Sequence, residues 1–455
     1  MPKLGEELFD LTLRTAGGVY SVGERAGHAQ VSIWRNWPQG GPTDVSKFTY
    51  DVVGGKALRP RDGGPAPAAP VSVAWYPGAA PRGGVAAERI GLVLPTSLCS
   101  GEVAKKITDS LNAELAAGAG GALARRVTRF VSLPHTEGCG TGYPENGINM
   151  YTRVMLGHLT HPSVATALCL EHGCEKTHND FFTNSMRDAG LPADRVGFAS
   201  IQLDGGIEAV TAKVKAYFRG AAEAAEAGGA PHGVGTRRPG DARALTVGLV
   251  VSDKGAGAAG VLPELALAGA ALARALTAGG GGLVVPANSP LLRAPLFTDA
   301  LVLPAPADGD SPAPVAPTLA FGEAAPPGGG VHVMDMPYVK DFSETVTGLA
   351  AAGVHMVLLL STPPRKGAAR PAPGHPIVPV VHVGLAAAGA AVDPAYAAAT
   401  DALLTTEGRG AAATGEAWAA GALEALAAVA SGERPAKAAR ATFFSITRGP
   451  TGVST

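Results

Sequence analysis

The segment PHTEGCGTGYPENGINMYTRVMLGHLTHPSVATALCLEHGCEKTHN, residues Pro134–Asn179, decides the fold class. Within it, Gly147–Leu159 spaces its apolar side chains at helical intervals. Val164–Leu170 is a short apolar run that is typical of a buried strand. A helix followed at once by a buried strand is the repeating element of a parallel β/α sheet. The segment therefore predicts a β/α unit with polar loops at its two ends.

The same alternation continues on both sides of this segment. Further strands of the first series are expected at Arg89–Leu94, Val127–Leu133 and Val196–Ile201, and further helices at Ser100–Leu115, Asp180–Ala189 and Ile207–Phe218. A second series has expected strands at Leu245–Val251, Gly282–Val285, Val331–Met334, Val354–Leu360 and Ile377–Val383, an Ala-rich helix between its first two strands, and helices at Ser343–Ala352 and Gly415–Ala430. We predict an α/β fold with two doubly wound, mostly parallel β/α units and Pro/Gly-rich loops.

Four stretches dense in Pro, Gly and Ala lack any periodicity and are expected to be linkers or surface loops that bury no face. They are Gly54–Gly84, Gly220–Ala242, Pro304–Gly330 and Pro363–Pro373. The predicted domains are an N-terminal extension over residues 1–88, an α/β domain with the Cys/His cluster over 89–219, a linker over 220–242 and a second α/β domain over 243–455.

Composition excludes several classes of function. Among 455 residues, 37 Lys and Arg balance 38 Asp and Glu, so neither nucleic acid nor an anionic membrane is expected as a partner. Four cysteines are too few for a disulfide framework and fit a reducing compartment. We see no secretory signal and no run of about 18 apolar residues, so a cytoplasmic protein without a spanning helix is expected. The sequence leaves open whether the protein forms a homo-oligomer.

Three polar clusters follow the first three expected strands. They are Thr96–Ser100, His135–Gly140 and His172–Glu175. Because ligands of open α/β sheets bind outside the carboxyl ends of the strands, parallel neighbouring strands would bring these loops to one crevice.

The thiols and imidazoles of this region have structural as well as functional interpretations. Cys169 lies inside an expected strand and is interpreted as a core thiol. Cys99 is either a loop filler or functional, whereas Cys139, between two glycines, and Cys174 favour function. His135, at a strand end, is the best general-base candidate. At the end of the expected helix, His158 and His161 are either surface cations matched to the helix dipole or ligands, and His172 and His178 are expected to face solvent.

Standard motifs do not identify the chemistry. The sequence has no CxxC and no HExxH, so it matches no common zinc pattern. It has no GxxxxGK[ST] and no GxGxxG after a strand, and the absence of GxSxG weighs against an α/β-hydrolase.

At these residues the chain resembles a known family. The resemblance runs through Val93–Thr96, Cys99-Ser100, Glu102–Ala104 and His135–Gly140, then through Asn149, Arg153, Gly157, His161 and Pro162, and through Gly173–Glu175, Met334–Pro337, Pro376–Val380 and Arg448–Thr451. These motifs are similar, in order, to those of the altronate/galactarate dehydratases, which are sugar-acid hydro-lyases related to a sulfolactate sulfo-lyase subunit. Two loops depart from the family. Val250–Lys254 keeps only the Ser252-Asp253 pair of a "CGGSD" loop, and Ser361–Gly367 replaces a "TTGRGS" loop with a proline-rich sequence.

The resemblance implies metal-dependent dehydration of a sugar acid to a 2-keto-3-deoxy acid, with ferrous iron, or manganese in its place, as the cofactor. A base removes the proton α to the carboxylate, and the metal stabilises the enediolate. The residues expected to be catalytic are His135, Glu175 and Arg153, those expected at the metal are Cys139, Cys174 and Cys99, and those expected to bind substrate are Asn149, His161, Ser252 and Asp253. Arg153 is expected to hold the substrate carboxylate, because a guanidinium makes bidentate contacts with that group. A sulfo-lyase on the same scaffold, or a non-catalytic relative that binds a ligand or partner, is the alternative.

Overall fold

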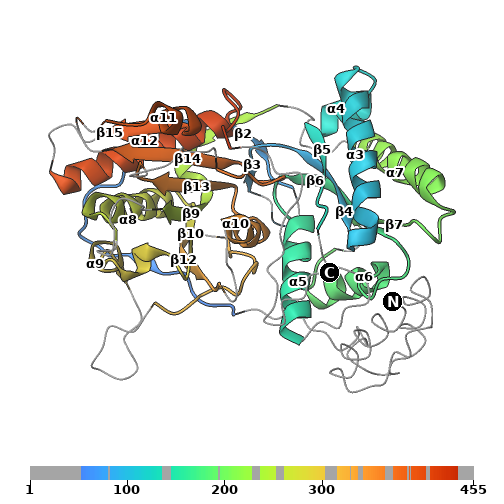
Figure 1. Ribbon diagram of the computed structural model, residues 1–455, viewed down its shortest axis with the longest axis horizontal. Helices are drawn as coiled ribbons and strands as arrows, with labels where there is room; N and C mark the ends of the chain where they lie inside the picture. The colour runs from blue at the N-terminus through green and yellow to red at the C-terminus, as the bar shows by residue number, and fades with distance from the viewer. Residues whose placement is uncertain are drawn as a thin grey trace, which may run out of the picture.

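Two parallel sheets with helices packed against them hold most of the strands (Figure 1). The structure is a computed structural model and describes residues 53–79, 82, 84–135, 145–192, 195–227, 236–252, 261–302, 315–327, 329–336, 342–363, 372–386, 389, 391–405 and 410–438. The predicted α/β fold class is confirmed. None of the helices in these ranges combines the length and the apolar character needed to cross a membrane.

The first parallel sheet has four strands in the order β5-β4-β6-β7. The strands are β4 (Ile90–Pro95), β5 (Arg129–Ser132), β6 (Val164–Glu171) and β7 (Val196–Ser200), and the helices are α3 (Leu98–Ala116), α4 (Ala122–Arg126), α5 (Glu145–Leu159), α6 (Asn179–Asp188) and α7 (Ile207–Ala227). Val93 packs with α3 and α7, while Leu92 and Leu94 pack with α5 and α6. Because both faces are covered, the central strand β4 is apolar throughout.

The second parallel sheet has six strands in the order β12-β10-β9-β13-β14-β15. The strands are β9 (Thr246–Ser252), β10 (Gly282–Pro286), β12 (Gly330–Met334), β13 (Met356–Ser361), β14 (Val380–Ala386) and β15 (Ala402–Thr405). The helices α8 (Pro263–Ala278) and α12 (Ala411–Ala430) share one core with this sheet, and α10 (Phe342–Ala351) belongs to another. Short elements complete this half: α9 (Pro295–Thr298), α11 (Pro394–Ala399), η4 (Ala242–Ala244) and η6 (Pro290–Arg293).

Two of the stretches expected to be linkers or surface loops contain whole strands, so the loop prediction is wrong for those residues. β2 (Ser72–Pro77) pairs with β3 (Val85–Ala86) and with β8 (Arg238–Asp241), all antiparallel, and β1 (Arg59–Pro60) pairs with β11 (Leu301–Val302). Trp75 is buried, and a side chain at Gly240 would lie 2.3 Å from its indole ring. The glycine of the supposed linker is therefore a packing residue, since it lets the indole lie against the β8 backbone.

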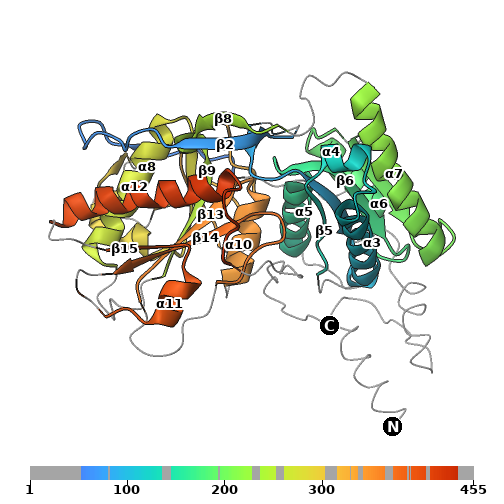
Figure 2. The same cartoon turned by 90° about the horizontal axis from the view of Figure 1, so that it is seen from above.

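The two parallel sheets share one apolar core, in which α5 of the first half lies beside α10 of the second (Figures 1 and 2). The helices approach closely at Gly157, where a Cβ atom would lie 2.4 Å from the carbonyl oxygen of Ala351. Only glycine allows this approach, so the position is fixed by packing.

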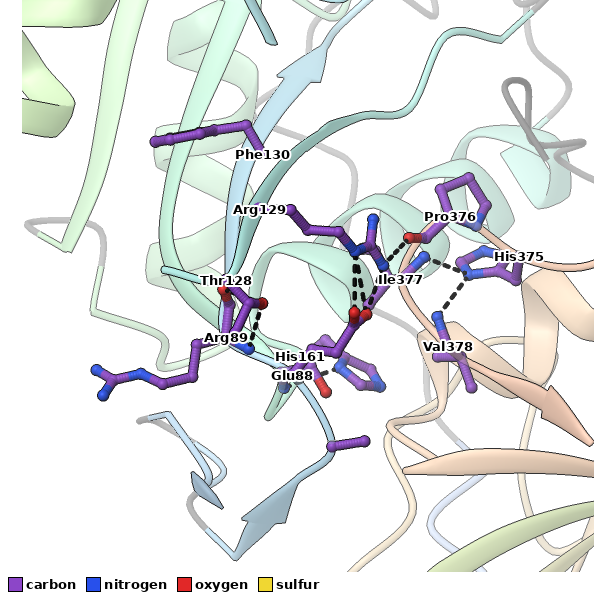
Figure 3. Close-up of polar contacts among 12 residues, drawn as sticks. Glu88, Arg89, Thr128, Arg129, Phe130, His161, His375, Pro376, Ile377 and Val378 are labelled. Carbon is purple, nitrogen blue, oxygen red and sulfur yellow. Dashed lines mark hydrogen bonds and ion pairs between the residues drawn. The ribbon is translucent and has the colours of Figure 1, made fainter. Parts of the chain in front are cut away.

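Buried histidines connect the two halves beside this core. His158 and His161 are fully buried, so neither is a surface cation at a helix end. The Nδ1 atom of His375 accepts hydrogen bonds from the backbone N–H groups of Ile377 and Val378 at 3.1 and 3.2 Å (Figure 3). The ring proton of His375 is therefore on Nε2. This Nε2 atom lies 3.3 Å from Nε2 of His158. His158 then donates from Nδ1 to the carbonyl of Val154 at 2.6 Å. Both rings are therefore neutral in this arrangement.

Candidate functional site

The candidate site lies where the strand order of the four-stranded sheet changes direction. The chain runs from β4 outward to β5, then returns to place β6 on the other side of β4. The switch point is thus between the carboxyl ends of β4 and β6, which is where open α/β sheets bind their ligands. The loops after these two strands are Thr96–Ser100 and His172–Glu175, two of the three predicted clusters.

Glu175 joins the two loops. Its carboxylate accepts five hydrogen bonds: from the hydroxyls of Thr96 and Ser97 at 2.7 and 3.0 Å, and from the backbone N–H groups of His172, Gly173 and Cys174 at 2.8, 2.7 and 3.0 Å. Burial alone would raise the pKa of Glu175, but these donors lower it overall. The side chain is therefore an ionised carboxylate that holds the loop in shape.

The shape of the loop after β6, His172–Glu175, which is the third predicted cluster, depends on Gly173. Its φ of 119° lies in a region that L side chains rarely adopt, and a Cβ atom there would lie 2.9 Å from the side-chain oxygen of Gln202. The turn at this glycine brings Nδ1 of His172 to 3.2 Å from Sγ of Cys174. Within the described residues, the ligand atoms of His172, Cys174 and Glu175 all lie within 4.8 Å of one another, a spacing that suits a metal ion.

The second predicted cluster also reaches this site. His135, which follows β5, is buried and places Nε2 3.0 Å from the carbonyl oxygen of Pro95 at the end of β4. Since a carbonyl only accepts, Nε2 carries the proton and the lone pair is on Nδ1. Burial lowers the pKa of His135 to about 4, against a small opposing effect of the Pro95 hydrogen bond, so the ring is neutral at neutral pH. The expected convergence of the loops is confirmed for the described parts of all three.

Several predicted residues lie around this centre. Cys99 is exposed in the first turn of α3, and it is absent from the cluster of close ligand atoms. Asn149 and Arg153 are both buried and four residues apart on α5, so they share one face of that helix. The Nε atom of Arg153 donates to the carbonyl of Phe321 at 3.1 Å, which turns Arg153 toward the second half of the protein.

Other predicted residues lie elsewhere. His161 precedes β6 at the opposite edge of the sheet, where Nδ1 accepts from the N–H of Ser163 and Nε2 donates to the carbonyl of Val354, both at 3.0 Å. A substrate-binding role for His161 at this centre therefore does not fit the geometry. Ser252 ends β9 in the other sheet, at the switch point between β9 and β13. Cys139 and Asp253 lie outside the described residues.

Sequence reasoning missed two residues of the third loop. His172 was expected to face solvent, but the turn at Gly173 brings its ring to Cys174. Lys176 follows Glu175 and is half-buried, and burial lowers its pKa to about 7. No periodic pattern in the sequence predicts the burial of Lys176, because this burial arises from the packing of the loop.

Comparison with known proteins covers the same domain. Residues 81–226 match the family model described as D-galactarate dehydratase/Altronate hydrolase, second domain. This range contains the whole four-stranded sheet and the three loops at its switch point. No curated protein matches the chain. The match therefore shows similarity to the D-galactarate dehydratase/altronate hydrolase family over residues 81–226, about a third of the chain.

Proposed function

We propose that the protein dehydrates a sugar acid, altronate-like or galactarate-like, to a 2-keto-3-deoxy acid with the help of a divalent metal ion, ferrous iron or manganese. One observation carries the proposal. The family domain places an imidazole nitrogen of His172 3.2 Å from the thiol of Cys174 at the ligand-binding edge of its sheet.

The donor set fits such an ion. Nδ1 of His172 and Sγ of Cys174, which lie 3.2 Å apart, would be the atoms that hold the ion. Imidazole and thiolate suit first-row transition metals. Glu175 already accepts five hydrogen bonds, so we assign it to positioning the two ligands rather than to binding as a third.

In this mechanism each residue has a separate task. A bound divalent ion supplies Lewis acidity that favours an enediolate over its parent acid. His135, whose pKa burial lowers to about 4, is neutral at neutral pH and is assigned as the base that accepts the α-proton. Arg153, whose Nε donates to the carbonyl of Phe321, is assigned to hold the substrate carboxylate.

The test measures metal content and turnover separately. The purified full chain is loaded anaerobically with ferrous iron or manganese and assayed with D-altronate, D-galactarate and sulfolactate. The variants His172→Ala and Cys174→Ala are expected to lose bound metal and turnover together. Cys169→Ala is the matched control, because Cys169 is a buried thiol within β6 and outside the three-residue cluster.

The outcomes distinguish the candidate functions. A 2-keto-3-deoxy acid formed by the wild type and the control, but not by the two variants, supports the proposal. Release of sulfite from sulfolactate would instead assign a sulfo-lyase. Absence of both turnover and metal binding in the folded wild type would reject an enzymatic role at this centre and leave a ligand-binding relative.

A further inference from the structure

A cavity of about 520 Å³ lies at the edge of the four-stranded sheet opposite the candidate metal centre. Its lining includes Val164 and Val196, the first residues of β6 and β7. Three arginines also line it: Arg89 just before β4, Arg126 at the end of α4, and Arg195 just before β7. The volume is in the range of small-molecule sites.

The positive charge of this cavity is not neutralised by the described part of the chain. No described lining residue is acidic, and the guanidinium groups of Arg89, Arg126 and Arg195 make no hydrogen bond or ion pair with any described residue. Neighbouring arginines differ in this respect. Arg125 pairs with Glu226 at 2.6 Å, and Arg129 pairs with Glu88 at 2.6 Å, while Figure 3 shows Arg89 pointing away from that second pair.

Buried polar atoms without partners mark the same cavity. The Nε atom of Arg126 is buried and has no hydrogen-bond partner among the described residues. Ser163, another lining residue, is 1% exposed, and its hydroxyl oxygen also has no partner there. Buried polar groups are nearly always hydrogen-bonded, so a guanidinium and a hydroxyl left without partners beside one cavity indicate a ligand that accepts hydrogen bonds.

We propose that this cavity binds a small-molecule oxyanion, a phosphate ester or a polycarboxylate, through Arg89, Arg126 and Ser163, with Arg195 at its exposed rim. The guanidinium groups supply charge-assisted hydrogen bonds to the anionic oxygens. Leu159 and Met186 form part of an apolar wall for the carbon skeleton of the ligand. Burial lowers the pKa of Arg89, and the nearby charge of Arg126 lowers it further; a bound anion would relieve that repulsion.

This site is separate from the candidate metal centre. The β6 strand begins at the cavity with Val164 and ends with Glu171 beside the loop that holds His172 and Cys174. Eight residues of strand span roughly 23 to 26 Å. A ligand of ordinary metabolite size therefore cannot occupy both sites at once, and the proposal stands whether or not the protein is a dehydratase.

Binding is tested by calorimetric titration of the full chain with inorganic phosphate, pyrophosphate and citrate at constant ionic strength. We expect saturable binding of at least one probe. The variant Arg126→Gln should weaken it about tenfold or more, and Ser163→Ala should weaken it by a smaller factor. Arg125→Gln is the matched control, since it removes the same charge from the adjacent residue, which pairs with Glu226. Arg89→Gln provides a second cavity variant if Arg126→Gln does not fold, as judged by circular dichroism.

Preference for pyrophosphate over citrate would identify a phosphate-bearing ligand, and the reverse preference a polycarboxylate. The proposal is overturned if none of the probes binds saturably. It is also overturned if the folded cavity variants bind as tightly as the Arg125→Gln control.

Discussion

The buried histidines should make the fold sensitive to mild acid. Burial lowers the pKa of His135, His158 and His355 to about 4 each, whereas a histidine in the unfolded chain titrates near 6.5. Between these values the unfolded state binds more protons, so the free energy of unfolding falls as the pH falls through this window. Above pH 6.5 the penalty is absent, and below pH 4 it is complete.

The size of the effect follows from these values. Lowering the pH from about 7.5 to about 5.5 should cost roughly 1 to 2 kcal/mol per histidine, or roughly 4 kcal/mol for the three together. That is a large part of the stability of a typical domain. His161 and His375, whose pKa values burial lowers still further, add to the loss in the same direction.

Urea unfolding at both pH values, followed by circular dichroism at fixed ionic strength, measures the loss directly. The variant His375→Asn keeps an acceptor for the N–H groups of Ile377 and Val378 but removes a titrating ring. It should therefore show a shallower pH dependence than the wild type. His178→Asn, in a partly exposed position, is the control for replacing a histidine by asparagine. A wild-type unfolding midpoint that is equal at both pH values would refute the reasoning.

Three further predictions follow from individual contacts. Glu175→Gln replaces one acceptor oxygen with an amide that faces N–H and O–H donors, so it should lower the free energy of unfolding by about 3 kcal/mol. The control Glu102→Gln, at an exposed position, should not change the midpoint of urea unfolding. Gly157→Ala should cost about 1 to 3 kcal/mol through overpacking against Ala351, while Gly220→Ala, in a helix with open space around it, should be neutral or slightly stabilising; equal thermal midpoints for the two variants would contradict this packing. Iodoacetamide should label the exposed Cys99 before Cys169, whose pKa is raised by burial, and mass spectrometry of the native protein would expose the reverse order.

Elements with apolar runs were predictable from sequence because burial on both faces leaves a clear pattern. The runs at Arg89–Leu94 and Val164–Leu170 correspond to β4 and β6 within one residue at either end. The antiparallel pair β2 and β8 was missed, since Gly240 signals a loop when read alone and its packing against Trp75 depends on a strand more than 160 residues away. Local sequence does not record such a partner.

The candidate site likewise has parts that the sequence predicts and parts that it does not. The strand-end rule located the three loops, because it depends only on strand order and direction. The contact between His172 and Cys174 depends on a positive φ at Gly173 and on the five donors that fix Glu175, two of which come from the other loop. Those contacts exist only in the assembled sheet, so a sequence pattern could rank Cys174 but not pair it with His172.

The pairing of the N-terminal segment has a consequence for synthesis on the ribosome. Leu58 exchanges backbone hydrogen bonds with Val331, and Arg59 pairs with Val302. At translation rates of about 5 to 20 residues per second, Val331 leaves the ribosome roughly 15 to 55 s after Leu58. Residues 58–60 must therefore wait, without their partners, until most of the chain has been made. The first strand in the described part of the chain is therefore among the last to pair, so a nascent chain that stops before Val331 cannot complete the fold.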